Sequence, residues 1–198
     1  GSLSSTPQKC YAYLVYEWWV RTFPQAEFKY VNAGIGGTTS QFGVARAQDD
    51  LLDAEPDFVI AEFSVNDEST GHFEETYEGL VRKILSSKSH PALMLVHNVC
   101  YNNGASAELV HSRIARHYNI PSVSMQSTLY KALLNCRFDN RRITPDDLHP
   151  NDCGHELVSM VITKRLEQIK NTVKAEYETA KSQRAAAQPD AGAAALLP

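Results

Sequence analysis

Residues 58–85 read FVIAEFSVNDESTGHFEETYEGLVRKIL, and this stretch decides the class of fold. Residues 58–63 form a short apolar run, which is typical of a buried strand, and residues 64–71 form a polar loop. The apolar residues that follow recur at the three- and four-residue spacing of an amphipathic helix: Tyr77, Leu80, Val81, Ile84 and Leu85. The stretch therefore predicts a strand, a loop and a helix in succession.

The same order of elements is expected along most of the chain. Further strand-like runs occur at residues 28–31, 92–96 and 122–125. Further helical patterns occur at residues 7–23, 41–52, 107–118 and 153–169. One more helix is expected after the run at residues 122–125, and it ends near Leu134. Short strands that alternate with helices predict a parallel sheet covered by helices on both faces, which is a three-layer α/β/α fold.

Composition indicates one globular domain followed by a tail. Of the 198 residues, 43% are hydrophobic and 21% are charged, which is enough for one sizeable core. Beyond Lys170 the composition shifts to Lys, Glu, Gln and Ala, and the chain ends in AAAQPDAGAAALLP. We therefore expect a domain over residues 1–170, followed by a helical extension and a disordered Ala-rich tail over residues 171–198.

Charge and hydropathy exclude two classes of partner. The formal net charge is -4 and no run of Lys or Arg is present, so no basic surface is expected to bind nucleic acid. No apolar run approaches the roughly 18 to 20 residues of a membrane-spanning helix, so a soluble protein is expected. The sequence does not indicate an oligomeric state.

The cysteines favour a reducing compartment. Cys10, Cys100, Cys136 and Cys153 are scattered and form neither a CxxC pair nor a dense disulfide pattern, so reduced thiols and a cytoplasmic protein are favoured. The first residue is Gly1 rather than Met, however, so a signal peptide can lie upstream of it. The localisation therefore stays open.

Three loops carry residues suited to chemistry, and each also has a plainer reading. Residues 32–40 read NAGIGGTTS, whose glycines allow a tight turn with bare N–H groups but also suit an ordinary turn before a helix. Asn66 and Asp67 follow a predicted buried strand, where they can face a substrate oxygen or cap a helix. Because reactive groups of doubly wound sheets gather after the strands, these loops are the candidate site.

The third loop reads DDLHP over residues 146–150. A carboxylate three residues before a histidine can reach its Nδ1 atom, which fixes the tautomer and leaves Nε2 as a general base. A lone pattern of this kind is also common in surface loops. The occurrence of all three loops in this order is therefore more informative than any one of them.

The chain resembles the SGNH or GDSL serine hydrolases over residues 1–169, with greatest similarity to their carbohydrate-esterase branch. The resemblance rests on NxGxxG at residues 32–37, on ND at residues 66–67 and on DxxHP at residues 146–150. It implies a flavodoxin-like parallel sheet of five strands and hydrolysis of short acyl esters through an acyl-enzyme, without metal or organic cofactor. The implied substrate is a small-molecule or saccharide ester, most plausibly an acetylated carbohydrate.

The resemblance also assigns roles to particular residues. Gly37 would donate its backbone N–H, and Asn66 its side-chain amide, to the oxyanion. Asp146 would orient His149, which would take the proton from the nucleophilic serine and return it to the leaving alcohol. Asp147 matches a position without a catalytic role in the family.

The nucleophile is the point of departure from the family, which places its serine in a G-(D/G)-S-(I/L)-(S/T)-x-G turn after the first strand. Either Ser2 is that serine, or Gly1 closes the motif and the serine lies upstream; the short spacing from Ser2 to Tyr11 favours the second register. In both registers the first strand is missing, which would leave sheet edges unpaired. The chain as given is therefore expected to be inactive, as a fragment or as a degenerate, non-catalytic binding domain.

Other candidate sites are weaker. A zinc site can be drawn from a set of His and Cys residues, but their spacing matches no compact ligand set: His97, Cys100, His149, Cys153 and His155. Trp18 and Trp19 suggest a sugar-stacking surface, yet their helical spacing with Leu14 and Val15 favours a core role for at least one of them. Solvated or capping roles are expected for the histidines without a motif: His72, His90, His111 and His117.

Overall fold

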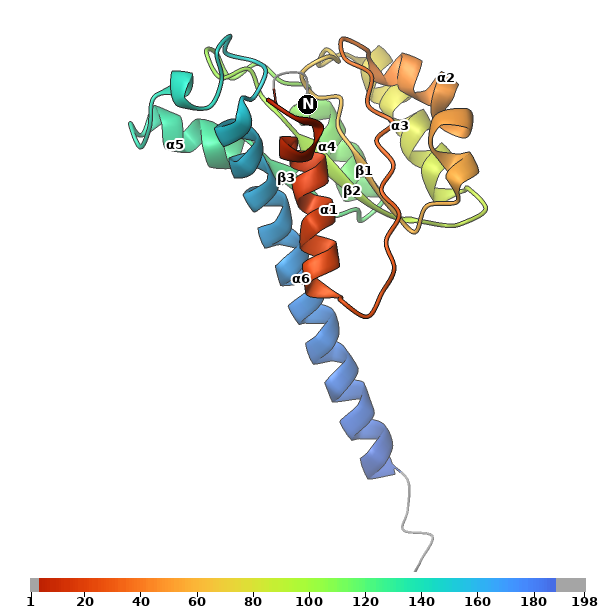
Figure 1. Ribbon diagram of the computed structural model, residues 1–198. Helices are drawn as coiled ribbons and strands as arrows, with labels where there is room; N and C mark the ends of the chain where they lie inside the picture. Colours follow the sequence, from red (N-terminus) through yellow and green to blue (C-terminus); the bar gives the residue numbers. More distant parts are fainter. Residues whose placement is uncertain (1–3, 188–198) are drawn as a thin grey trace, which may run out of the picture. The chain divides into compact units, whose positions relative to one another are not determined.

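The computed structural model describes residues 4–187, with side chains as far as Arg184 (Figure 1). Ser2 and the end of the predicted tail, residues 188–198, lie outside the described residues. The chain divides into two compact units, residues 1–162 and residues 163–198. The first of these units contains the sheet and all of the candidate site residues that the structure describes.

The sheet of the first unit has three parallel strands in the described part of the chain. These are β1 (Phe58–Ala61), β2 (Ala92–His97) and β3 (Ser122–Ser124), in the order β1-β2-β3. Ile60 pairs with Met94, and Val96 pairs with Val123. The parallel α/β architecture predicted from the alternating elements is therefore confirmed.

The prediction of a strand at residues 28–31 is wrong. Residues 27–35 belong to no helix or strand, and no backbone hydrogen bond joins them to β1 or to any other described strand. An extended segment becomes part of a sheet only when a neighbour takes up its N–H and C=O groups, and β1 pairs with β2 alone among residues 4–187. The described sheet thus has three strands where the resemblance implied five, and one edge of β1 is left unpaired.

The helices agree closely with the periodic patterns. The first unit contains α1 (Tyr11–Thr22), α2 (Ser40–Asp50), α3 (Gly71–Leu85), α4 (Glu108–His117) and α5 (Lys131–Leu134). Short helical turns are η1 (Pro7–Lys9), η2 (Leu52–Ala54), η3 (Gln126–Tyr130) and η4 (Asn140–Arg142). The helix predicted at residues 7–23 is interrupted at Cys10, whose ψ of 147° is extended rather than helical.

The last helix, α6 (Asp152–Ala187), begins in the first unit and contains the second unit as far as the structure describes it. The closing helix expected at residues 153–169 continues without a break into the segment expected as a helical extension, whose residues, such as Ala, Glu and Lys, have high helix propensity. None of the helices in residues 4–187 has the length and hydropathy needed to cross a membrane.

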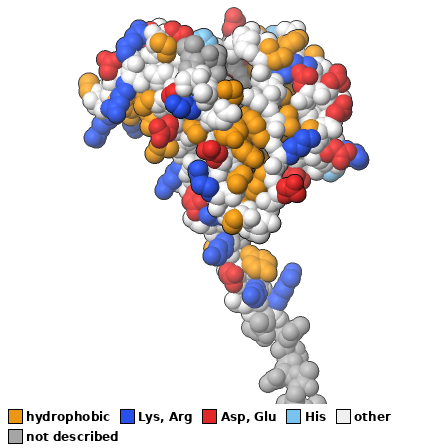
Figure 2. Space-filling model, viewed as in Figure 1, with side chains coloured by type: hydrophobic (Ala, Val, Ile, Leu, Met, Phe, Trp, Pro, Cys, Tyr) orange, Lys and Arg blue, Asp and Glu red, His pale blue; other side chains and the backbone are white. Residues whose placement is uncertain are grey.

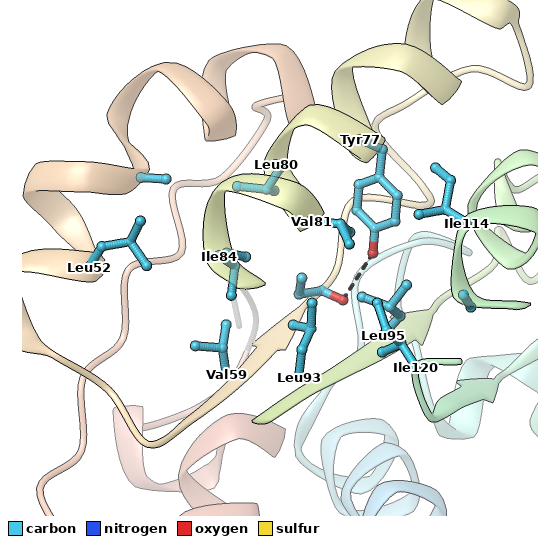
Figure 3. Packing of buried hydrophobic residues seen from close by; sticks show 13 residues of the cluster. Leu52, Val59, Tyr77, Leu80, Val81, Ile84, Leu93, Leu95, Ile114 and Ile120 are labelled. Carbon is cyan, nitrogen blue, oxygen red and sulfur yellow. Dashed lines mark hydrogen bonds between the residues drawn. The ribbon is translucent and has the colours of Figure 1, made fainter. Parts of the chain in front are cut away.

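The core lies between the sheet and the helices α3 and α4 (Figure 3). Tyr77, Leu80, Val81 and Ile84 of α3 are almost fully buried, which is the apolar stripe expected from their spacing. They pack against strand residues such as Val59, Leu93 and Leu95. The hydroxyl of Tyr77 donates to the carbonyl of Ala61 at 3.4 Å, at the carboxyl end of β1. The core therefore fixes the point at which the chain leaves β1 for the loop that carries Asn66.

Aromatic residues connect α1 with β1. The ring centroid of Trp19 lies 5.4 Å from that of Phe58 and 5.5 Å from that of Phe23. Trp18 and Trp19 are both half-buried, so the core role expected for one of them stays a prediction. The rings of Tyr13 and Tyr16 of α1 contact that of Tyr30, which lies in the segment 27–35, with centroid distances of 5.5 and 5.4 Å. Figure 2 shows hydrophobic side chains gathered over and beside α1 on the face viewed.

Candidate active site

Asp146 and His149 form a hydrogen-bonded pair in the loop between η4 and α6. Oδ2 of Asp146 lies 2.7 Å from Nδ1 of His149. The other oxygen, Oδ1, accepts from the backbone N–H of His149 at 2.8 Å, from that of Leu148 at 3.1 Å and from the hydroxyl of Thr144 at 3.2 Å. These contacts aim one carboxylate oxygen at the imidazole, as the sequence pattern predicts.

The same contacts set the charge of Asp146. The hydrogen bonds from the ring and backbone of His149 hold the pKa of the Asp146 carboxyl well below its usual range. An ionised carboxylate at Nδ1 favours the tautomer that carries its proton there, so that Nε2 has a lone pair. The side chains of His149 and Asp146 are 45% and 46% exposed, so the pair lies at the surface of the first unit.

Asp147 fixes the loop rather than taking part in the pair. Its φ of 69° is in the left-handed region, which is uncommon for a residue other than glycine. Its carboxylate accepts hydrogen bonds from the side chains of Asn140 and Arg141, the latter at 3.0 Å. Its carbonyl accepts from the N–H of Tyr101 at 2.6 Å. These contacts hold the turn between Asp146 and His149 in one conformation.

Asp152, in the first turn of α6, ties the beginning of the described chain to this loop. Its carboxylate accepts from the N–H and hydroxyl of Ser5, both at 2.7 Å, and from the ammonium of Lys9 at 2.9 Å. The hydrogen bonds from Ser5 are the main reason that the pKa of Asp152 falls to about 2. Asp152 lies only three positions after His149 in the sequence, so Ser5 is bound by a residue close to the His149 loop.

Gly154 allows α6 to begin close beneath the His149 loop. A Cβ atom at this position would lie 2.2 Å from the carbonyl oxygen of Ile143 and 2.9 Å from Cβ of Pro150. The first of these distances is far below van der Waals contact with rigid backbone, so only glycine fits. The close approach holds Ile143 and Pro150, and with them the segment that contains both members of the pair.

Replacing Gly154 by Ala is expected to lower the free energy of unfolding by about 3 kcal/mol, the upper end of the usual cost of overpacking. The matched control is Gly79→Ala in α3, where the nearest atom to a new Cβ is a methyl carbon of Val44 at 3.9 Å. This control should gain about 0.5 to 1 kcal/mol from helix propensity. Urea unfolding measures both variants, and equal stability of the two would contradict the close contact at Gly154.

Gly37 and Asn66 lie on exposed loops that precede α2 and α3. Gly37 has a φ of 70°, which the turn requires and which favours glycine. Asn66 sits in a turn after β1, in which its N–H donates to the carbonyl of Phe63 at 3.0 Å. The loops before α2, α3 and α6 lie at the same end of the first unit (Figure 1). This is the arrangement that a parallel sheet gives to the loops that follow its strands.

The Asn66 loop is anchored beneath by polar contacts. Glu62 accepts from the N–H and hydroxyl of Ser64, at 2.9 and 2.8 Å. The same hydroxyl donates to the carbonyl of Asn98 at 3.0 Å, which joins this loop to the end of β2. Loss of hydration raises the pKa of Glu62, and its hydrogen bonds from Ser64 oppose that shift.

Two residues have a larger part in the site than the sequence indicates. Asp67 is buried, and it caps α2 through the N–H of Ser40 rather than capping the helix that follows it. His111, expected to be solvated, is fully buried and lies 3.0 Å from the carboxylate of Asp67. The available signal was spacing, because His111 shares the buried stripe of α4 with Val110 and Ile114.

The cysteines and histidines form no metal centre among the described residues. No group of three or more His, Cys, Asp or Glu residues among residues 4–187 is arranged to hold a metal ion. The four cysteines are all free thiols. His155 instead contacts Tyr11, whose N–H donates to its Nδ1 at 3.3 Å.

Comparison with known proteins adds to this geometry. Residues 4–157 match the GDSL-like Lipase/Acylhydrolase family. The chain belongs to this family. The match includes the loops of Gly37 and Asn66 and the Asp146–His149 pair. A curated relative by sequence is the thioesterase 1/protease 1/lysophospholipase L1 of Escherichia coli (strain K12), which is 26% identical over 158 residues, covering 74% of this chain and 71% of the relative.

Solved structures extend the comparison. A two-domain esterase (CEX) active on acetylated mannans, co-crystallised with mannopentaose, is 70% identical, with a TM-score of 0.85 over 86% of this chain. The chain spans 47% of that esterase, about half its length. Axe2, an acetylxylan esterase from Geobacillus stearothermophilus, is 20% identical, with a TM-score of 0.65 over 79% of this chain and 80% of Axe2. This second similarity shows that the chain has the same fold as Axe2.

Proposed function

We propose that this protein hydrolyses short-chain acyl esters, acetyl esters of saccharides in particular, through an acyl-enzyme. The observation that carries the proposal is the Asp146–His149 pair, with its 2.7 Å bond to Nδ1, in a chain of the GDSL-like family. The similarity to an esterase active on acetylated mannans, at 70% identity, supports an acetylated saccharide as substrate.

In the proposed mechanism, His149 acts first as a base and then as an acid. Its Nε2 takes the proton of a serine hydroxyl as the serine oxygen bonds to the ester carbonyl carbon. The tetrahedral oxyanion accepts hydrogen bonds from the N–H of Gly37 and the side-chain amide of Asn66. The bond to the alcohol then breaks, and the alcohol leaves with the proton from His149. Water, deprotonated by the same nitrogen, then attacks the carbonyl carbon of the acyl-serine. The bond to the serine oxygen breaks, His149 returns the proton to that oxygen, and acetate is released.

We infer that the nucleophile is Ser2 or a serine that precedes Gly1. Ser5 is unsuitable, because its hydroxyl donates to the carboxylate of Asp152 at 2.7 Å rather than to a histidine. Asp152 in turn anchors Ser5 next to the His149 loop.

The test uses two forms of the protein: residues 1–198, and the protein expressed from its natural start codon. Each is treated with a fluorophosphonate, which reacts with activated serines, and the labelled residue is mapped by mass spectrometry. Labelling upstream of Gly1 in the longer form alone is expected. Labelling at Ser2 would establish the other register, and no labelling in either form would indicate a non-catalytic domain.

Substrate class is measured in the longer form by release of acetate from acetylated mannan and acetylated xylan oligosaccharides. A long-chain acyl thioester and a lysophospholipid serve as comparisons, because the E. coli relative is named for these activities. Acetate release from a saccharide, with little turnover of the lipid substrates, is the expected result. The opposite preference would contradict the proposed substrate class while leaving ester hydrolysis intact.

A further inference from the structure

Asp67 joins two of the loops of the candidate active site. It directly follows Asn66, and its backbone N–H donates to the carbonyl of Phe63 at 2.9 Å. Its Oδ1 accepts from the backbone N–H of Ser40 at 2.8 Å, and Ser40 lies three residues after Gly37. A single side chain therefore connects the segment that carries Asn66 with the segment that carries Gly37.

His111 binds the second oxygen of this carboxylate. Its Nε2 lies 3.0 Å from Oδ2 of Asp67, and both side chains are 0% exposed. The ring of Tyr77 stacks on the imidazole with centroids 3.7 Å apart and an angle of 17° between the planes. Because Tyr77 belongs to the packed face of α3 and His111 to that of α4, the core determines where the carboxylate of Asp67 can lie.

Burial of the Asp67 carboxylate costs free energy, and hydrogen bonds to both of its oxygens offset that cost. A buried carboxylate is stable only when its oxygens have hydrogen-bond partners. Each oxygen of the Asp67 carboxylate has such a partner, a backbone amide of α2 for Oδ1 and an imidazole of α4 for Oδ2. Ser40, which supplies the first, is itself buried and bonds through its hydroxyl to Thr76 of α3 at 2.8 Å. The connection is thus part of the core rather than a surface contact.

We propose that Asp67, held by His111, is the positioning residue of the oxyanion donors Gly37 and Asn66. This inference rests on the proposed function. Both donors lie on exposed loops, and hydrogen-bond donors for an oxyanion must be held to within about 0.5 Å to be effective. Loss of the carboxylate would allow the two loops to move independently, so that stabilisation of the transition state would fall while binding of the ground state would change little.

The kinetic test is Asp67→Ala in the active form of the protein. The kcat for p-nitrophenyl acetate is expected to fall about 10- to 100-fold, less than the loss of a donor itself, with KM within about twofold. Phenylboronic acid, which forms a tetrahedral adduct with an activated serine, should lose affinity by a similar factor. Asp67→Asn should recover most of the kcat, because its amide oxygen can still accept from the N–H of Ser40.

A control variant that is destabilised to a similar degree as Asp67→Ala distinguishes the positioning role from a purely structural one. Ile84 is buried at the other end of α3, so Ile84→Ala should lower the Tm while leaving kcat and the affinity for the boronic acid unchanged. If Asp67→Ala behaves like Ile84→Ala, with a lower Tm and an unchanged kcat, the positioning role is wrong. A parallel loss of kcat and of boronate affinity in Asp67→Ala alone supports it.

A second measurement is independent of the reaction. In ¹H–¹⁵N spectra of Asp67→Ala, the amide signals of Gly37 and Asn66 should shift or broaden together, and the amide of Ser40 should exchange faster with solvent. In Ile84→Ala these signals should stay in place. Absence of esterase activity would overturn the proposed function, whereas unchanged loop amides in Asp67→Ala would overturn the positioning of the loops whatever the reaction is.

Discussion

Replacing His149 by Ala is expected to reduce the hydrolysis of p-nitrophenyl acetate to near background in the active form of the protein. Removal of the base of a triad lowers kcat by about 10⁴-fold or more, because no other group takes the proton of the nucleophile. The 2.7 Å contact between Nδ1 of His149 and Oδ2 of Asp146 is the geometry that this proposed role requires. Initial rates at saturating substrate provide the measurement.

The control for this variant is His117→Ala, an exposed histidine at the end of α4. Its kcat should equal that of the unaltered protein, since it contacts none of the three loops. Circular dichroism should show that both variants are folded. A kcat for His149→Ala within tenfold of the unaltered protein would overturn the assignment of the acid–base pair.

The second large effect is expected for Asn66→Ala, which removes a side-chain donor from the oxyanion. Loss of one such donor lowers kcat by about 10² to 10³-fold, with little change in KM, because the bond forms mainly in the transition state. Asn66 is exposed, and only its backbone N–H takes part in the turn, so the substitution should not destabilise the fold. Steady-state kinetics and thermal unfolding of the same sample test both statements.

Asn171→Ala, on the exposed part of α6, is the matched substitution outside the site. It should leave kcat and KM unaltered. A fall in kcat of less than tenfold for Asn66→Ala would remove Asn66 from the oxyanion assignment, even if the histidine prediction holds. The two experiments therefore test different parts of the proposed mechanism.

Local patterns were sufficient for the elements that contact one another along the chain. The stripe of Tyr77, Leu80, Val81 and Ile84 predicted both α3 and its buried face, because helical spacing and burial coincide there. The Asp146–His149 contact also spans only three residues, so it was predictable from this spacing together with the order of the three loops. Sequence reasoning succeeds where the partner of a residue lies within a turn of it.

Features that depend on distant partners were not predictable. Residues 28–31 have the composition of a strand, but a strand forms only by pairing, and no described strand is hydrogen-bonded to them. His111 was taken for a surface histidine because its partner, Asp67, is 44 residues away. The need for glycine at position 154 comes from the carbonyl of Ile143, which lies on a separate turn.

A strand that paired with the free edge of β1 from outside residues 4–187 would add to the stability of the first unit. Along that edge the backbone N–H and C=O groups of residues 58–61 have no partner strand among residues 4–187. Any extended peptide that binds there stabilises the folded state by RT ln(1 + [L]/Kd), about 2.7 kcal/mol at a hundredfold excess over Kd. The melting temperature of residues 4–187 would then rise with the concentration of such a peptide.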